Sequence, residues 1–163
     1  MISENKKKWD ARFMKVAQYT ATWSKDPSTK VGALLVSARR PLASGFNGFP
    51  KGHPDDPELY ADREYKYQHI VHAEINALDQ AIHFCSARVI RGSTMYLNFP
   101  PCPDCVRAMA VHGIARVVYL PLELTEGYQE RGREWVEQWQ SAWQESRRVA
   151  QESVIQLEPY YGQ

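Results

Sequence analysis

The sequence predicts an α/β fold of three layers, α-β-α, in which helices cover both faces of a sheet of about five strands. Short apolar runs typical of buried strands recur along the chain, and longer segments with a helical period separate them. With 163 residues, the chain has room for one domain with a substantial core but not for two comfortable ones. We therefore interpret residues 1–163 as a single domain.

The first predicted elements are a helix and a pair of antiparallel strands. Apolar residues recur at a roughly helical period over residues 5–23, and the polar, proline-containing segment 24–27 ends that helix. Residues 31–36 form a buried type of strand, and residues 42–46 follow a short turn as its antiparallel partner. Residues 47–64 are polar and rich in proline and glycine, so we expect a long loop there, and long ordered loops are often functional.

The second half predicts three more helix and strand pairs. A helix is expected over residues 71–84, and another opens at Pro101 or Pro103 and ends at Gly113. A long helical pattern covers residues 129–151, and its tryptophans stand four apart on one face, which is typical of core packing or of a subunit interface: Trp135, Trp139 and Trp143. The remaining strands are predicted at 94–99, 117–120 and 154–157.

Composition excludes some classes of partner. The formal net charge is +1, which gives no whole-molecule reason to bind a long nucleic acid. No apolar run is long enough to span a bilayer, and the first residues lack the apolar centre of a signal peptide. We therefore expect a cytoplasmic protein without a membrane partner.

Three side chains predict a zinc site. Cys102 and Cys105 form a CxxC pair at a predicted helix start, where backbone N–H groups stabilise thiolates, and His72 offers a third ligand from another helix start. Three protein ligands with an open fourth position are typical of a catalytic zinc. The remaining cysteine, Cys85, has no partner at ligand spacing, so we interpret it as a small core residue.

Glu74 is the predicted acid and base. It stands two residues after His72, within reach of the fourth zinc position, where a carboxylate can take a proton from water and return it to a substrate. An H-x-E segment followed by P-C-x-x-C resembles the signature of zinc deaminases that act on nucleobases.

Other interpretations of the same residues stay open at this point. A CxxC pair alone is also typical of a redox site or of half a structural zinc site, and a lone histidine is more often a buried core residue. A protein that used zinc only for assembly would keep the ligands without needing Glu74. A fourth protein ligand on the metal would favour that assembly role.

Over residues 9–120 the sequence resembles the deoxycytidylate (dCMP) deaminases. The resemblance rests on HAEINA at 72–77, on the Pro-Cys cluster, and on segments that favour this family over related deaminases: SKDP at 24–27 and GFNGFPKG at 45–52. It implies a cytidine-deaminase-like fold with a five-stranded mixed sheet of order 2-1-3-4-5. It also implies zinc bound by His72, Cys102 and Cys105, with Glu74 as the proton shuttle.

The same resemblance implies substrate contacts. Asn47 corresponds to an asparagine that contacts the sugar, and the backbone N–H near Ala73 is expected to bind the cytosine O2. Ser24 and Lys25 are candidates for the neighbourhood of the 5′-phosphate, since a nucleotide dianion needs hydroxyl and cationic donors.

The implied reaction is deamination of dCMP to dUMP with release of ammonia, which supplies dUMP for dTMP synthesis. The alternatives within this chemistry are dCTP, a modified cytosine nucleotide or a tRNA adenosine, the last disfavoured by the near-neutral charge. The family resemblance further implies a homohexamer that dCTP activates and dTTP inhibits, with Mg²⁺ on the phosphates of the allosteric nucleotide.

Two segments depart from the family pattern. Many relatives have Thr-Leu-Glu-Pro where this chain has Asn98-Phe99-Pro100-Pro101, and two successive prolines restrict the backbone beside the base. Some relatives bind a second, structural zinc near the long loop. Here that region has no cysteine, so we expect a solvated loop around its candidate ligands, which are His53, Asp55, Asp56 and His69.

Overall fold

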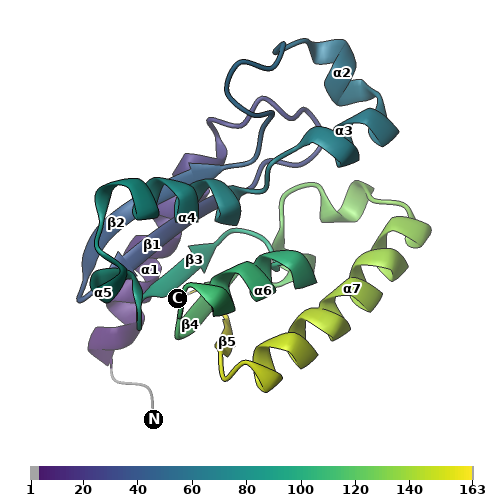
Figure 1. The fold of residues 1–163 in the computed structure, drawn as a ribbon. Helices are drawn as coiled ribbons and strands as arrows, with labels where there is room; N and C mark the ends of the chain where they lie inside the picture. Colours follow the sequence, from purple (N-terminus) through teal and green to yellow (C-terminus); the bar gives the residue numbers. More distant parts are fainter. Residues whose placement is uncertain (1–3, 163) are drawn as a thin grey trace.

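A five-stranded mixed sheet forms the centre of the protein (Figure 1). The computed structural model describes residues 4–162. The strand order is β2-β1-β3-β4-β5, which confirms the predicted order; β1 is antiparallel to β2 and β3, and β3, β4 and β5 run parallel. The strands are β1 (Gly32–Ser37), β2 (Arg40–Phe46), β3 (Thr94–Leu97), β4 (Arg116–Tyr119) and β5 (Gln156–Pro159).

Helices cover both faces of this sheet, as predicted. The helix α1 packs on one face, and α4, α6 and α7 lie on the other (Figure 1). None of the helices in the described part of the chain is long and apolar enough to cross a membrane. The α-helices are α1 (Glu4–Ala21), α2 (Pro57–Ala61), α3 (Arg63–His69), α4 (Ala73–Phe84), α5 (Ala87–Ile90), α6 (Pro103–Val111) and α7 (Arg133–Glu152), and the short 3-10 helices are η1 (Leu122–Leu124) and η2 (Tyr128–Glu130).

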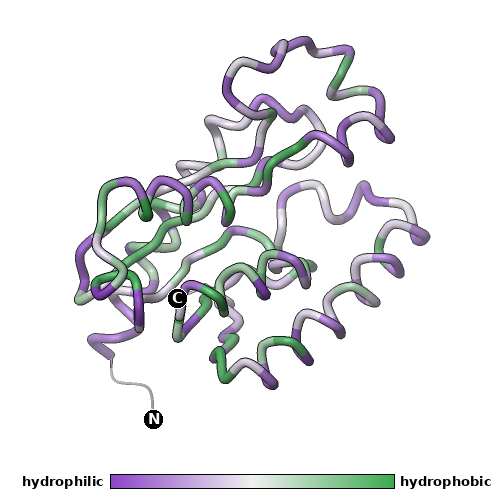
Figure 2. The backbone as a smooth tube through the Cα atoms, viewed as in Figure 1, coloured by the Kyte–Doolittle hydropathy of each residue, from purple (hydrophilic) through white to green (hydrophobic). Residues whose placement is uncertain are grey.

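The central strand β1 explains why its sequence is a continuous apolar run. Successive side chains of a strand point to opposite faces. Leu34 and Val36 therefore join the cluster under α1, whereas Ala33 and Leu35 join the larger cluster under α4 and α6. Hydrophobic colour is concentrated on the strands in Figure 2, and the excursion that holds α2 and α3 is largely hydrophilic.

Two glycines let helices approach the sheet more closely than any other residue would. A Cβ atom at Gly45 in β2 would lie 2.3 Å from the carbonyl oxygen of Ala73 and 2.4 Å from the amide nitrogen of Ala77. At Gly32 in β1 it would lie 2.1 Å from the carbonyl oxygen of Ala17 in α1. The first contact fixes the start of α4, the helix that carries the predicted acid.

The long loop predicted over residues 47–64 is only partly a loop. Residues 57–61 form α2, and α3 begins at residue 63. The side chain of Asp56 accepts a hydrogen bond from the amide of Glu58, and that of Asp62 accepts one from the amide of Tyr65. These caps stabilise helices of 5 and 7 residues, which are too short to show a helical period in the sequence.

The tail also differs from its predicted boundaries. α7 begins at Arg133, after η2, rather than at residue 129. β5 begins at Gln156, because Val154 adopts a left-handed backbone with φ of 59° in the turn that follows α7. The last strand then pairs in parallel with β4.

We expect Gly45→Ala to destabilise the protein by at least about 1–3 kcal/mol, because the methyl group overlaps backbone atoms that cannot move independently. Urea unfolding followed by circular dichroism measures the change. Gly132→Ala is the matched control, since a Cβ atom at Gly132 has no neighbour within 4 Å. Equal stability of both variants would contradict this account of how α4 is seated.

Candidate metal centre

Two helix N-termini bring the predicted zinc ligands together. His72 is the N-cap of α4, and Cys102 is the N-cap of α6, with extended backbone at both positions. Pro103 occupies the first turn of α6, where a missing N–H costs nothing, and Cys105 follows in the same turn. The amides of a first helical turn have no intrahelical acceptor and carry partial positive charge, so both thiols lie where a thiolate is stabilised.

The three side chains converge on one point. The Nδ1 atom of His72 lies 3.5 Å from the Sγ atom of Cys102 and 3.3 Å from that of Cys105. One ligand atom from each residue lies within 4.8 Å of the others, and within residues 4–162 no other histidine, cysteine or carboxylate joins this group. One imidazole and two sulfurs suit zinc, and a set of three leaves a fourth position for a non-protein ligand.

Hydrogen bonds shift the pKa values of these three side chains in different directions. The hydrogen bond from Cys105 lowers the pKa of Cys102 to about 4, and the same contact raises the pKa of the Cys105 thiol. The hydrogen bond to Cys102 raises the pKa of His72 to about 9. Cys102 is therefore already a thiolate at neutral pH, whereas His72 and Cys105 must each lose a proton before they can bind a metal.

Glu74 lies beside the three ligands but not among them. It belongs to the first turn of α4 and is 4% exposed. Burial raises the pKa of its carboxyl group, because water no longer solvates the charged form. A raised pKa makes the carboxylate a stronger base, which favours the proton uptake that general acid–base catalysis requires.

These residues border a cavity of about 480 Å³. His72, Glu74 and Cys102 line it together with Asn47 and the backbone of Ala73. Of the described residues, none accepts a hydrogen bond from the amide of Ala73, which stands in the first turn of α4. The cavity thus presents a metal-binding set, a buried acid and an unused amide donor to one small ligand.

Comparison with known proteins assigns the family. The model for the cytidine and deoxycytidylate deaminase zinc-binding region matches residues 7–121. The chain belongs to this family of deaminases. All three candidate ligands, His72, Cys102 and Cys105, lie within the region that the zinc-binding family model matches, and so does Glu74.

The deaminase has characterised and uncharacterised relatives. It is 37% identical over 130 residues to an uncharacterized deaminase of Aliivibrio fischeri, a match that covers 80% of this chain and 83% of the relative. It is 33% identical over 120 residues to the deoxycytidylate deaminase of Mus musculus, covering 69% of this chain and 64% of the mouse protein. This deaminase thus spans somewhat less than two thirds of the mouse enzyme's length.

The fold is also that of a solved relative. The apo crystal structure of dCMP deaminase from the cyanophage S-TIM5 superposes with a TM-score of 0.66 and 25% identity, covering 98% of this chain and 100% of the cyanophage chain. The superposition includes the C-terminal region that lies beyond the family match.

Four residues were predicted from the resemblance to contact substrate, and two of them line the cavity. Asn47 and Ala73 line the cavity, but Ser24 and Lys25 do not. Ser24 is buried and donates its hydroxyl hydrogen bond to the carbonyl oxygen of Asn47. Lys25 is exposed and pairs with Asp55.

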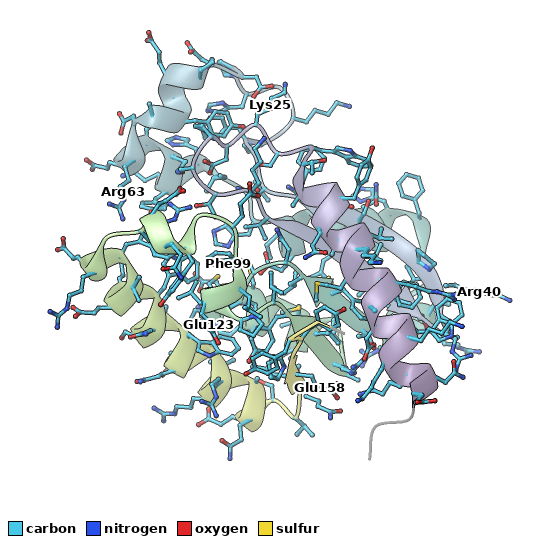
Figure 3. The ribbon with its side chains drawn as sticks, turned by 180° about the vertical axis from the view of Figure 1, so that it is seen from behind. Lys25, Arg40, Arg63, Phe99, Glu123 and Glu158 are labelled. Atoms are coloured by element: carbon cyan, nitrogen blue, oxygen red, sulfur yellow. The ribbon has the colours of Figure 1, made fainter. Side chains whose placement is uncertain are left out.

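Sequence reasoning missed several cavity residues. Lys66 in α3 and Arg131 before α7 both line the cavity, although no role was predicted for either from the sequence. Arg63 of α3 lies beside the segment that leads into α7 (Figures 1 and 3). For Lys66 and Arg63, the signal that could have pointed to the site is the functional tendency of the long polar segment that begins at residue 47.

The tryptophan stripe is divided between the cavity and the core. Trp135 and Trp139 line the cavity, where the ring of Phe99 lies 6.3 Å and 4.9 Å from theirs. Trp143 instead packs on Tyr119, with ring centroids 4.6 Å apart. Core packing, the favoured prediction for the stripe, therefore describes Trp143, whereas Trp135 and Trp139 border the cavity. Phe99, which departs from the family pattern, is their packing partner.

The residues considered for a second zinc are used in other contacts. His53 and His69 both contact Tyr65, and Asp56 caps α2. In the part of the chain that the structure describes, they do not form a group of three ligand atoms close enough to share an ion.

We expect zinc binding to release about two protons near neutral pH, one from His72 and one from Cys105. The apparent zinc affinity should then rise with pH by about 100-fold per pH unit between about pH 6 and 8. Titration calorimetry of the metal-free protein, in buffers with different ionisation enthalpies, counts the protons. An enthalpy that is independent of the buffer would show that these groups do not carry the protons assigned to them.

Proposed function

We propose that this deaminase catalyses the zinc-dependent hydrolysis of dCMP to dUMP and ammonia, and so supplies dUMP for dTMP synthesis. The observation that carries the proposal is the convergence of His72, Cys102 and Cys105 beside a buried Glu74 at the wall of a nucleotide-sized cavity. Residues 1–163 would act as one zinc-dependent deaminase domain.

The donor set fits zinc, and the chain's own residues supply the proton transfers. When bound by His72, Cys102 and Cys105, zinc would provide the Lewis acidity that makes water a nucleophile at neutral pH. Glu74 takes the proton that this water loses as its oxygen adds to C4 of the base, and delivers that proton to N3. The proton left on the attacking oxygen then passes through Glu74 to the amino group, which leaves as ammonia when the C4–N bond breaks.

Two further groups would orient the nucleotide. The free amide of Ala73 is placed to donate a hydrogen bond to the cytosine O2. Asn47 is held rigidly: its Oδ1 accepts the amide of Val31 at 2.8 Å, and its Nδ2 donates to the carbonyl oxygen of Thr29 at 2.8 Å. Nδ2 also donates to the Oδ2 atom of Asp26 at 3.5 Å, so the second lone pair of Oδ1 is the atom that can accept a hydrogen bond from a sugar hydroxyl.

Deoxycytidylate is favoured over other cytosine nucleotides by the relatives. Proteins named deoxycytidylate deaminase match at 33% identity, and the cyanophage enzyme of the same fold has been solved with dCMP and dUMP. A non-catalytic assembly role is disfavoured, because the described residues supply three ligand side chains and leave Glu74 beside them.

We expect the purified protein to convert dCMP to dUMP faster than it deaminates dCTP, a modified cytosine nucleotide or the adenosine of a tRNA. Chromatography of the products at matched substrate concentrations measures this preference. Repeating the panel with dCTP and dTTP in the presence of Mg²⁺ tests the proposed activation and inhibition, and light scattering tests the proposed hexamer. Faster turnover of any other substrate than of dCMP would reject the proposed substrate.

We expect Glu74→Gln to lower kcat by about 10²–10⁴-fold, since the amide cannot carry protons, while the zinc content stays unchanged. Product formation and metal analysis by mass spectrometry give both quantities. Asp79→Asn is the control, because Asp79 makes the same acid-to-amide change on an exposed part of α4. Full activity of Glu74→Gln would remove the proton shuttle from the mechanism.

A further inference from the structure

A group of hydrogen-bond donors lies along the part of the cavity wall formed by the segment 26–29, α3 and the segment before α7. This group consists of Ser28, Thr29, Lys66 and Arg131, and all four line the cavity that also contains His72 and Glu74. We call it the cationic wall. Figure 1 shows that α3 and the segment before α7 come from distant parts of the chain, and residues of both line this cavity.

Lys66 is the fixed member of the cationic wall. Its ammonium group is buried, lies 3.3 Å from the Oδ2 atom of Asp26, and donates to the hydroxyl oxygen of Ser28 at 2.7 Å. The carboxylate of Asp26 also accepts hydrogen bonds from the amide and hydroxyl of Ser28 and from the amide of Thr29. Asp26 therefore anchors Lys66 and the loop that carries both hydroxyls in one arrangement.

Arg131 is the accessible member. Its Nη2 atom donates to the hydroxyl oxygen of Thr29 at 2.8 Å and to the carbonyl oxygen of Ser28, and its guanidinium group lies 4.7 Å from the ring centroid of Trp135. Of the described residues, none accepts a hydrogen bond from its Nη1 or Nε atoms. These atoms leave donors of a planar fork available for a ligand.

The electrostatics of the cationic wall favour a small dianion. Asp26 compensates the charge of Lys66, but no acid pairs with Arg131 within residues 4–162. Glu130, which precedes Arg131 in the chain, is exposed and lines the same cavity. The N-terminus of α7 at Gly132, also in the cavity wall, adds partial positive charge.

We propose that Arg131 and Lys66 bind the 5′-phosphate of the substrate, with Arg131 as the residue that selects a nucleotide over a nucleoside. This inference rests on the proposed function, because it names the phosphate subsite of the same cavity. Guanidinium groups bind phosphate through paired N–H donors, and the hydroxyl of Thr29, which accepts from Arg131, can donate its own hydrogen to the same phosphate. Arg131 lies outside residues 7–121, so the selecting residue comes from beyond the matched family region.

This assignment differs from the expectation for Ser24 and Lys25. Lys25 is 68% exposed at its side chain, pairs with Asp55 and does not line the cavity. Ser24 uses its hydroxyl on the backbone of Asn47. The phosphate contacts are therefore assigned to residues of the cavity wall and not to Ser24 or Lys25.

The test compares substrates with and without the phosphate. Arg131→Gln should lower kcat/KM for dCMP by about 10–100-fold, mostly through KM, and leave kcat/KM for deoxycytidine within about twofold. Arg131→Lys should recover part of the loss. Arg133→Gln and Lys25→Gln should match the unsubstituted protein on both substrates, because Arg133 pairs with Glu137 on the exposed side of α7.

Binding of dUMP and deoxyuridine, measured by calorimetry, gives the same comparison without turnover. Arg131→Gln should weaken dUMP binding by about 10-fold or more and leave deoxyuridine binding unchanged. Equal losses on both ligands would mean that Arg131 only supports the fold, and a selective loss in Lys25→Gln would move the phosphate site to Lys25; either result overturns the proposal. Absence of dCMP turnover in the unsubstituted protein would instead reject the proposed function.

Discussion

The site depends on holding two helix N-termini against each other at one edge of the sheet. The N-terminus of α4 brings His72 and Glu74, and that of α6 brings Cys102 and Cys105, so a metal bound there would be held between two helices that contact each other. Gly45 seats the first helix, since any side chain there would collide with the backbone of Ala73. The hydrogen bond from Ser146 to the carbonyl oxygen of Pro101, 2.8 Å long and buried, secures the loop before the second. The packing of the two helices therefore brings the ligand atoms of His72, Cys102 and Cys105 within 4.8 Å of one another.

Much of this arrangement is predictable from the sequence, and the reason is that it is built from regular elements. The strand order and the meeting of His72 with the cysteines follow from the family resemblance, and the apolar run at β1 follows from burial on both sides. Each of these features is marked in the sequence by a run of apolar residues or by a motif of fixed spacing.

The remaining features have no such local sign. The helices α2 and α3 are too short to show a period, and their caps, Asp56 and Asp62, look like ordinary loop acids in sequence. Lys66 and Asp26 are 40 positions apart, so nothing local announces their buried pairing. The aromatic contacts of Phe99 with Trp135 and Trp139 join a segment that departs from the family pattern to the tryptophan stripe of the tail, and the two look unrelated when read along the chain. In the structure these three aromatic side chains pack together and line the same part of the cavity.

The join between residue 121 and the tail has a consequence for how such enzymes diversify. Everything that handles the metal precedes it, whereas η2 and the first turns of α7 supply Arg131, Trp135 and Trp139 to the rim of the cavity. Drift or recombination in this C-terminal stretch can reshape the entrance while the reactive centre stays intact. Exchange of the segment after residue 121 among homologues would therefore change ligand selectivity and leave the metal-binding residues and Glu74 unchanged.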